Sequence, residues 1–227
     1  MALVLKPYGL SPWRHLNGSS WNGATNVYFI PKSDTTYYTI GDAVKSVVAV
    51  ATADNYDTTG IPNVTKATAG TAIRGVIVGV SPTRPGPNAS LVGNSLSLES
   101  TAVPATKTAG WYVYVCDDPS VIFKIQMNNG IPTGGIALAL CSSKNASLLV
   151  PAQTTGTLST MVLDPTTIAV TAALELKILH FINGPENQGA LGSDAIDLTV
   201  ATGQYANVAV RINMHELAGA VAGTLGV

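Results

Sequence analysis

Short runs of β-branched and aromatic residues, separated by turn residues, recur along this chain and constrain its fold more than any other feature. Valine, isoleucine and tyrosine predominate in residues 73–80 and 110–116. Residues 205–212 alternate strictly between two faces, one of them wholly apolar, which is the pattern of a strand with one face on a core. We find no helical stripe of useful length and no repeat of 20–50 residues. The sequence therefore predicts an all-β fold, an antiparallel β-sandwich or barrel with long loops.

The composition changes at both ends of the chain. Residues 1–25 are rich in Pro, Gly, Ser, Asn and Trp and have no regular period, so we expect an extended N-terminal arm. Residues 26–217 are predicted to form a single β domain, with a division into two β subdomains near 150–160 as the alternative. Residues 218–227 are mostly Gly, Ala and Val and are predicted to be a flexible C-terminal tail.

Two acidic residues and a proline separate the two clearest strands. Residues 110–116 and 121–126 flank Asp117-Asp118-Pro119, so this triplet is predicted to be the turn of a β-hairpin. The two carboxylates also resemble a pair for acid–base catalysis. The turn is the better interpretation, because Asp and Pro are common turn residues and strands lie on both sides.

The chain is poor in charge. Only 11% of its residues are charged, against roughly 25% in ordinary soluble domains. A neutral surface tends to associate, so we expect much of it to be covered by other subunits; a threonine-rich β surface exposed to water is the alternative. The net charge of −1 provides no basic excess for phosphates, and nucleic acid is therefore not expected as a partner.

The sequence contains no membrane or secretion signal that we recognise. No stretch reaches the ~18 uninterrupted apolar residues of a membrane helix, so no membrane partner is expected. Residues 1–10 lack the apolar run and small-residue cleavage site of a signal peptide, which predicts intracellular synthesis.

The residues most often used in catalysis and metal binding are few and scattered. His15, His180 and His215 do not have the spacing of a metal motif, and Cys116 and Cys141 do not form a CxxC pair. We expect two buried free thiols, with a disulfide between them left open. There is no Gly-x-Ser-x-Gly elbow and no phosphate loop. The prediction is no enzymatic activity, no metal and no cofactor; a β-rich hydrolase that depends on His180 or His215 is the remote alternative.

Five segments of the chain resemble, in order, elements of a family of small structural proteins of tailed bacteriophages. Residues 8–18 are similar to its "YGL-P-RHL-G" start, 41–44 to "GDPV", 75–80 to "GVFxGV", 112–126 to a "Y-DDP" hairpin, and 176–217 to an "LKIL…INEHEL" close. The chain departs from this pattern in its tail after Leu217 and in the proline-rich loop over 81–95.

The resemblance implies a decoration or cement protein of the phage head. It implies a β-rich chain, made in the cytoplasm of a bacterial host, that binds the outer surface of the capsid and clamps neighbouring subunits. The implied partners are the major capsid protein and other copies of the chain itself. The alternative function is a receptor- or carbohydrate-binding β module of a tail or fibre, which needs an exposed aromatic platform in a chain with only 6% aromatic residues.

A cement protein works by burying surface against its partner, not through a reactive site. The aromatic-bearing N-terminal arm is our candidate for this contact. The candidate interface residues are Tyr8, Leu10, Trp13, Arg14 and Trp21. Ordinary packing of the arm on its own barrel is the alternative.

Overall fold

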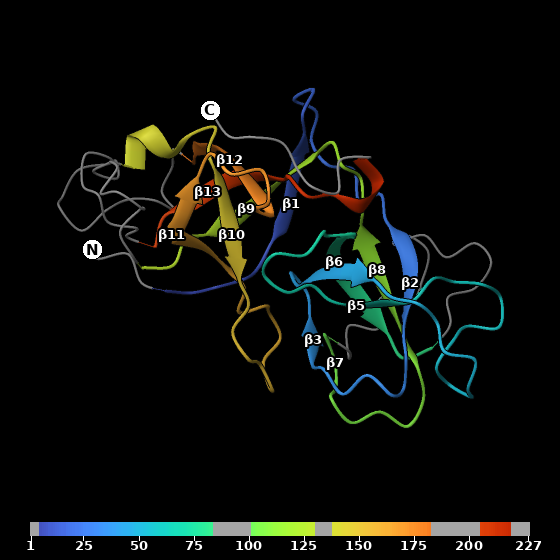
Figure 1. Ribbon diagram of the computed structural model, residues 1–227. Helices are drawn as coiled ribbons and strands as arrows, with labels where there is room; N and C mark the ends of the chain where they lie inside the picture. The colour runs from blue at the N-terminus through green and yellow to red at the C-terminus, as the bar shows by residue number, and fades with distance from the viewer. Residues whose placement is uncertain (1–4, 84–100, 130–137, 183–204, 219–227) are drawn as a thin grey trace.

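The computed structural model describes residues 5–83, 101–129, 138–182 and 205–218. Its regular structure is almost entirely strand, in antiparallel sheets that pack together, which confirms the all-β class (Figure 1). Within these residues, two short 3-10 helices, η2 (Leu138–Cys141) and η4 (Glu216–Ala218), accompany the strands.

The first of the two large sheets has five strands. In spatial order they are β2 (Asn26–Ile30), β8 (Trp111–Cys116), β6 (Gly75–Ser81), β4 (Ala43–Ser46) and β5 (Val64–Lys66). The sheet curls so that its two outer strands meet, because Phe29 N donates a hydrogen bond to Pro62 O at 3.0 Å. A separate two-stranded sheet, β3 (Tyr38–Thr39) with β7 (Ala102–Val103), accompanies it.

The second large sheet has six strands. In spatial order they are β1 (Ser11–His15), β9 (Val121–Gln126), β13 (Asn207–Ile212), β12 (Leu176–Phe181), β10 (Asn145–Leu149) and β11 (Val162–Ala169). This sheet curls as well: Asn128 N, just after β9, donates to Leu163 O of β11 at 2.8 Å.

Apart from β1, the two sheets have the same topology. Numbered by their order in the chain, the strands of each sheet lie in the order 1-5-4-2-3. In each sheet a parallel bridge also joins the first strand to the third. In the first sheet it links Phe29 of β2 to Asn63, just before β5, and in the second it links Met127, just after β9, to Leu163 of β11. We call residues 26–116 the first unit and residues 121–212 the second unit. The sheets thus divide the chain at 117–120, not near 150–160.

The two units also share local detail. The register of β6 against β8 shifts between Ile77 and Gly79, and that of β12 against β13 shifts between Ile178 and His180. Ahead of the second strand, Gly41 N donates to Ile77 O at 2.8 Å in the first unit, and Ser143 N donates to Ile178 O at 2.7 Å in the second. Gly41 has φ 93° and Ser143 φ 67°, so both units place a left-handed residue at this turn. The chain is therefore built as a structural duplicate.

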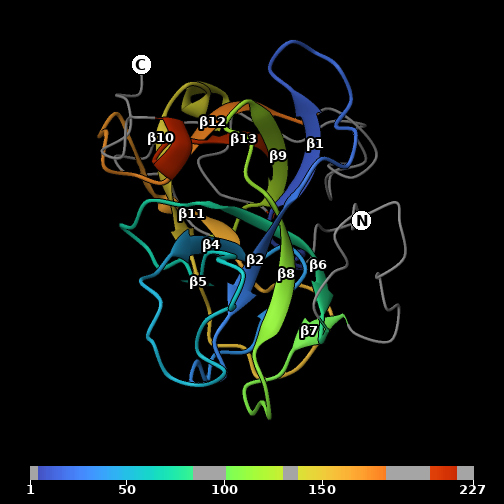
Figure 2. The ribbon, with the colours of Figure 1, turned by 90° about the vertical axis from the view of Figure 1, so that its right-hand side faces the viewer.

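The predicted hairpin over residues 110–126 is wrong. β8 pairs with β2 and β6, whereas β9 pairs with β1 and β13. The turn at Asp117-Asp118-Pro119 therefore carries the chain from one unit to the other, as Figure 2 shows for β8 and β9. A turn sequence specifies a change of direction, but not that the second strand pairs with the first.

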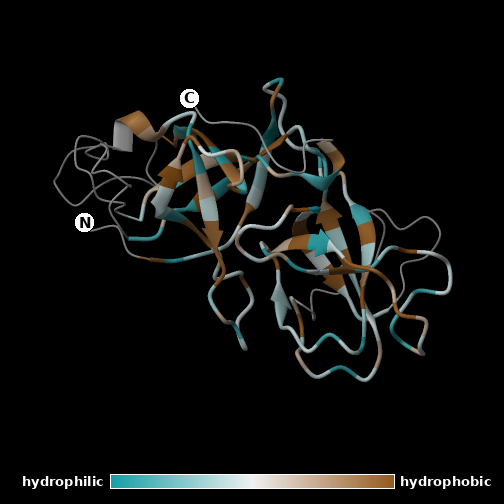
Figure 3. Ribbon diagram, viewed as in Figure 1, coloured by the Kyte–Doolittle hydropathy of each residue, from teal (hydrophilic) through white to brown (hydrophobic). Residues whose placement is uncertain are grey.

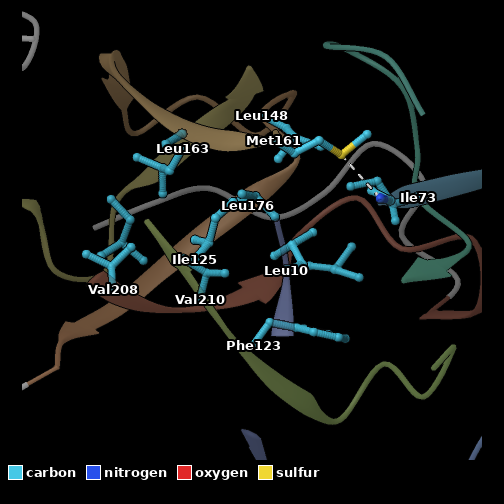
Figure 4. Packing of buried hydrophobic residues seen from close by; sticks show 14 of the residues in the cluster. Leu10, Ile73, Phe123, Ile125, Leu148, Met161, Leu163, Leu176, Val208 and Val210 are labelled. Atoms are coloured by element: carbon cyan, nitrogen blue, oxygen red, sulfur yellow. Dashed lines mark hydrogen bonds between the residues drawn. The ribbon is translucent and has the colours of Figure 1, made fainter. Parts of the chain in front are cut away.

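The largest core lies in the second unit and extends over its contact with the first. Phe123, Leu163 and Val208 of the second unit belong to this core, and Figure 4 shows Ile73 of the first unit beside Met161 of the second. A second core, which includes Tyr28, Ile30, Val64 and Val113, lies within the first unit. The hydrophobic colouring of Figure 3 follows the strands of both units.

The alternation predicted for residues 205–212 is present. Ala206, Val208, Val210 and Ile212 belong to the largest core. The opposite face is also covered, because Ala209 packs in a small third cluster with Ile122, Ile182, Trp13 and Leu179. The predicted tail over 218–227 lies outside the described residues except for Ala218.

Candidate functional site

The N-terminal segment holds all the predicted interface residues, and it forms part of a sheet instead of a separate arm. β1 pairs antiparallel with β9, Ser11 opposite Lys124 and His15 opposite Val121. The chain then turns back along β1, since Trp21 N donates to Trp13 O at 3.2 Å. The alternative of packing on the chain's own barrel therefore describes this segment better than an arm projecting from the domain.

Tyr8 and Leu10 contact the body of the protein directly. Leu10 is 1% exposed and belongs to the largest core, so its side chain is not available to a partner. The half-buried Tyr8 donates its hydroxyl proton to Asn207 Oδ1 at 2.8 Å. Just before it, Lys6 N donates to Gln126 Oε1 at 2.8 Å.

Two glycines allow the N-terminal segment to cross the first unit. A Cβ on Gly9 would lie 2.2 Å from Gly41 O and 2.5 Å from Ser159 Cβ. Gly9 also has φ 71°, in the left-handed region that glycine tolerates best. The Tyr8-Gly9 and Gly41-Asp42 motifs, far apart in the sequence, therefore meet at one crossing point.

Asp42 is the polar centre of this crossing. It is fully buried, and its carboxylate accepts hydrogen bonds from Ser159 Oγ at 2.6 Å and Thr39 N at 2.9 Å. Lys66 Nζ lies 2.8 Å from Asp42 Oδ2. The carboxylate is thus satisfied by groups of the protein, and we assign it a structural role.

Trp13 is the centre of a cluster of cations on the outer face of the six-stranded sheet. Arg14 Cζ lies 4.2 Å and Lys124 Nζ 4.9 Å from the centroid of its ring, within cation–π range. The ring of His180 is 6.0 Å away, and Arg14 Nη2 lies 3.4 Å from His180 Nε2. Burial, with a smaller effect from Arg14, lowers the pKa of His180.

Trp21 faces the other way. Its half-buried side chain packs against the largest core, and its Nε1 is buried without a hydrogen-bond partner. The five predicted residues thus follow one segment of chain but do not form one exposed patch.

The carboxylates at the junction of the two units bind neighbouring protein groups. Asp117 accepts hydrogen bonds from Asn26 Nδ2 at 2.9 Å and from the hydroxyl of Tyr28 at 2.5 Å, and Arg74 Nε lies 4.0 Å away. Burial and the hydrogen bond to Asp117 raise the pKa of Tyr28 to about 12. Asp118 accepts from Ser120 N at 2.7 Å, the hydrogen bond of a turn.

Glu175 is a buried carboxylate that the sequence did not reveal. It directly precedes β12, and its side chain is 0% exposed. It accepts hydrogen bonds from Gly70 N of the first unit and from Leu148 N of the second, the latter at 3.1 Å. Burial raises its pKa. Its role is to connect the two units.

The three histidines lie in three separate environments. His15 Nδ1 lies 3.4 Å from Asp118 Oδ2, and His180 lies beside Arg14. His215 is fully buried; its Nδ1 accepts from Leu217 N at 3.0 Å, and its Nε2 is buried without a partner. Over the described residues, no three His, Cys, Asp or Glu side chains come together in a way that could hold a metal.

Both cysteines are buried, and they are not joined in a disulfide. Burial raises the pKa of Cys116 to about 12 and also raises that of Cys141. Neither thiol is therefore a nucleophile near neutral pH, because the thiolate is the reactive form.

Two cavities lined by described residues of the first unit stand out, and neither was predicted. One, of about 270 Å³, is bordered by the exposed valines of the loop after β4, Val47, Val48 and Val50. The other, of about 550 Å³, lies at the end of β2 and β8; it is lined by Phe29, Ala53, Asp54, Tyr56, Asp57, Thr58, Pro82, Ala109, Gly110 and Tyr112. Long-range pairing builds both, so local sequence patterns carry no signal for them.

Comparison of the chain with protein-family models, with curated proteins and with solved structures gave no match. None of the helices within the described ranges is long and apolar enough to span a membrane.

Proposed function

We propose that this chain is a non-enzymatic structural protein of a tailed-phage head, which binds the outer surface of the capsid and cements neighbouring major capsid protein subunits. The five sequence segments that resemble such proteins support this proposal. The buried carboxylates of Asp42, Asp117 and Glu175 also support it, because each accepts hydrogen bonds from other parts of the protein, as structural groups do.

The observation that carries the proposal is a group of exposed apolar side chains on a chain with few charges. Val48 is 87% and Val50 59% exposed, and with Val47 they border the 270 Å³ cavity. Apolar side chains gathered around a surface hollow mark sites of protein–protein contact. With only 11% charged residues, little electrostatic repulsion opposes close contact with another subunit.

The test uses phage heads that lack the chain, to which purified protein is added back. Rebinding is measured by sedimentation, and head stability by the temperature at which packaged DNA is released. The wild-type chain is expected to bind and to raise this temperature. The double variant Val48→Ser, Val50→Ser is expected to bind at least about tenfold more weakly, about 1.4 kcal/mol.

The matched control is Val170→Ser, which changes a valine that is 50% exposed just after β11, away from the cavity. It should bind as the wild type does. Heads whose release temperature is unaffected by the wild-type chain would exclude the cement function.

A receptor- or carbohydrate-binding module of a tail or fibre is the second candidate. The 550 Å³ cavity favours it, because Tyr56 and Tyr112 lie there beside the carboxylates of Asp54 and Asp57. Aromatic rings with nearby hydrogen-bonding groups are a common lining of ligand sites. A glycan array distinguishes the two: glycan binding that is lost in Tyr56→Ala would favour the module over the cement protein.

A further inference from the structure

The structural duplication allows each position in one unit to be matched to a position in the other. The register shifts align Ile77 with Ile178, and their partners Val115 and Val210 therefore correspond. Three residues before Val115 and Val210 lie Tyr112 and Asn207, which therefore correspond. Their partners on the neighbouring strands, Phe29 and Gln126, correspond as well. These two pairs occupy the same place at the end of each unit.

In the second unit this place is filled by the N-terminal segment. Lys6 N binds the side chain of Gln126, and the Tyr8 hydroxyl binds the side chain of Asn207. From there the segment continues as β1 along the outer edge of β9, down to His15 opposite Val121. The second unit is thus a five-stranded sheet supplemented by a sixth, extended segment.

In the first unit the matching place is the 550 Å³ cavity. Phe29 and Tyr112 line it, with their rings edge to face at a centroid distance of 5.3 Å. Phe29 fits closely, since a Cβ on Gly110 would lie 1.9 Å from Phe29 Cζ. Tyr56, 42% exposed, lies at the same cavity. The lining offers an aromatic surface where the second unit offers two amides.

In the second unit, β1 pairs with the edge of β9 that faces away from β13. The corresponding edge of β2, which faces away from β8, is open among the described residues. β2 pairs with β8 along its whole length, and its one backbone bridge on the other side, within the described residues, joins Phe29 to Asn63. Phe29 N donates to Pro62 O, away from β8. Alternate residues of a strand direct their N–H groups to the same side, so Val27 N points to this open edge.

We propose that this edge and the adjoining cavity form a binding site for an extended segment of a partner protein. The segment runs antiparallel to β2, hydrogen-bonds to Val27, and places an aromatic or long apolar side chain against Phe29, Tyr56 and Tyr112. Addition of a strand to a sheet edge, with a side-chain pocket for specificity, is a general mode of peptide recognition. The chain's own segment from Lys6 to His15, which lies along β9 in the second unit, is an example of this mode of binding within the same molecule.

The probe is a fluorescein-labelled peptide with the sequence of residues 5–15, and a scrambled peptide is its control. Binding to the full chain is measured by fluorescence anisotropy. We expect saturable binding of the native sequence, weakened at least about tenfold by Val27→Pro, which removes the outward N–H, and by Tyr56→Ala, which removes part of the cavity wall. Val48→Ala, at the other cavity, should leave the affinity unchanged.

A second measurement does not depend on the variants. Amide hydrogen exchange of the wild-type chain should slow at Val27 when the peptide is added, because a new hydrogen bond protects that N–H. No binding up to about 1 mM, an affinity near −4 kcal/mol, would overturn the proposal. So would binding that is insensitive to both Val27→Pro and Tyr56→Ala, or a glycan that competes for the cavity. Self-association of the chain that is lost in Val27→Pro would identify a second copy as the occupant and overturn the assignment to a different protein.

Discussion

The N-terminal segment crosses the first unit in close contact at Gly9, and Gly9→Ala tests this crossing. A residue other than glycine at φ 71° costs about 1–2 kcal/mol. The new Cβ would also lie 2.2 Å from Gly41 O, far inside van der Waals contact. Relief of this clash requires the segment to move away from Gly41, which breaks the 2.9 Å hydrogen bond from Leu10 N to Gly41 O. A net hydrogen bond contributes about 1 kcal/mol.

Together these effects predict a loss of about 2–3 kcal/mol in the free energy of unfolding. For a chain of this size, 1 kcal/mol corresponds to a change of about 2–4 °C in Tm, so we expect Tm to fall by about 4–12 °C. The assay is differential scanning calorimetry of the purified chain.

Gly18→Ala is the matched control, since Gly18 has φ 89° but a Cβ added to it would meet no other atom within 4 Å. It should show the backbone cost alone, a fall of about 2–8 °C. Equal falls in the two variants would refute the close approach of Gly9 and Gly41. A Gly9→Ala protein as stable as the wild type would refute both parts of the reasoning.

Three further predictions concern buried groups. Asp42→Asn should lower the free energy of unfolding by about 3–5 kcal/mol in urea titrations, because it leaves the Lys66 ammonium, 12% exposed, without its partner. The control Asp54→Asn, at an exposed ion pair, should lower it by less than about 1 kcal/mol. The thiol of Cys116, with its pKa raised to about 12, should resist iodoacetamide at about pH 8 in the native chain and react after unfolding, as peptide mass mapping would show. Burial lowers the pKa of His215, so the unfolded chain takes up this proton first as the pH falls, and stability is lost from about pH 6.5 down to the folded-state pKa. The variant His215→Met should lack this part of the pH dependence of Tm. A pH profile of Tm that is the same in the variant and the wild type would contradict the burial of the ring.

The individual strands were predictable because their signal is local. Residues 110–116, 121–126 and 205–212 are rich in β-branched or aromatic residues, and strands form in all three. Their pairing was not predictable. Asp117-Asp118-Pro119 has the composition of a hairpin turn, yet the strands on its two sides belong to different sheets.

The candidate site was found only in part. The sequence singled out the N-terminal segment through its aromatic residues, and this segment does form a specialised strand. It could not show that Leu10 lies in the core or that the cavity opens near Phe29. It gave no sign that Glu175 is buried, because alternation identifies the face of a strand, but not whether another element covers that face.

The sequence by itself determined the all-β class, the position of the strands and the shortage of charge, since each depends on neighbouring residues or on composition. Only the tertiary structure decided which strands pair, that two units of one topology follow each other, and that residues 11–15 complete the second unit. The reason is physical: matching positions in the two units, such as Phe29 and Gln126, need only fit their own surroundings. Their backbone hydrogen bonds, which are the same for every residue type, define the shared fold without leaving a repeat in the sequence.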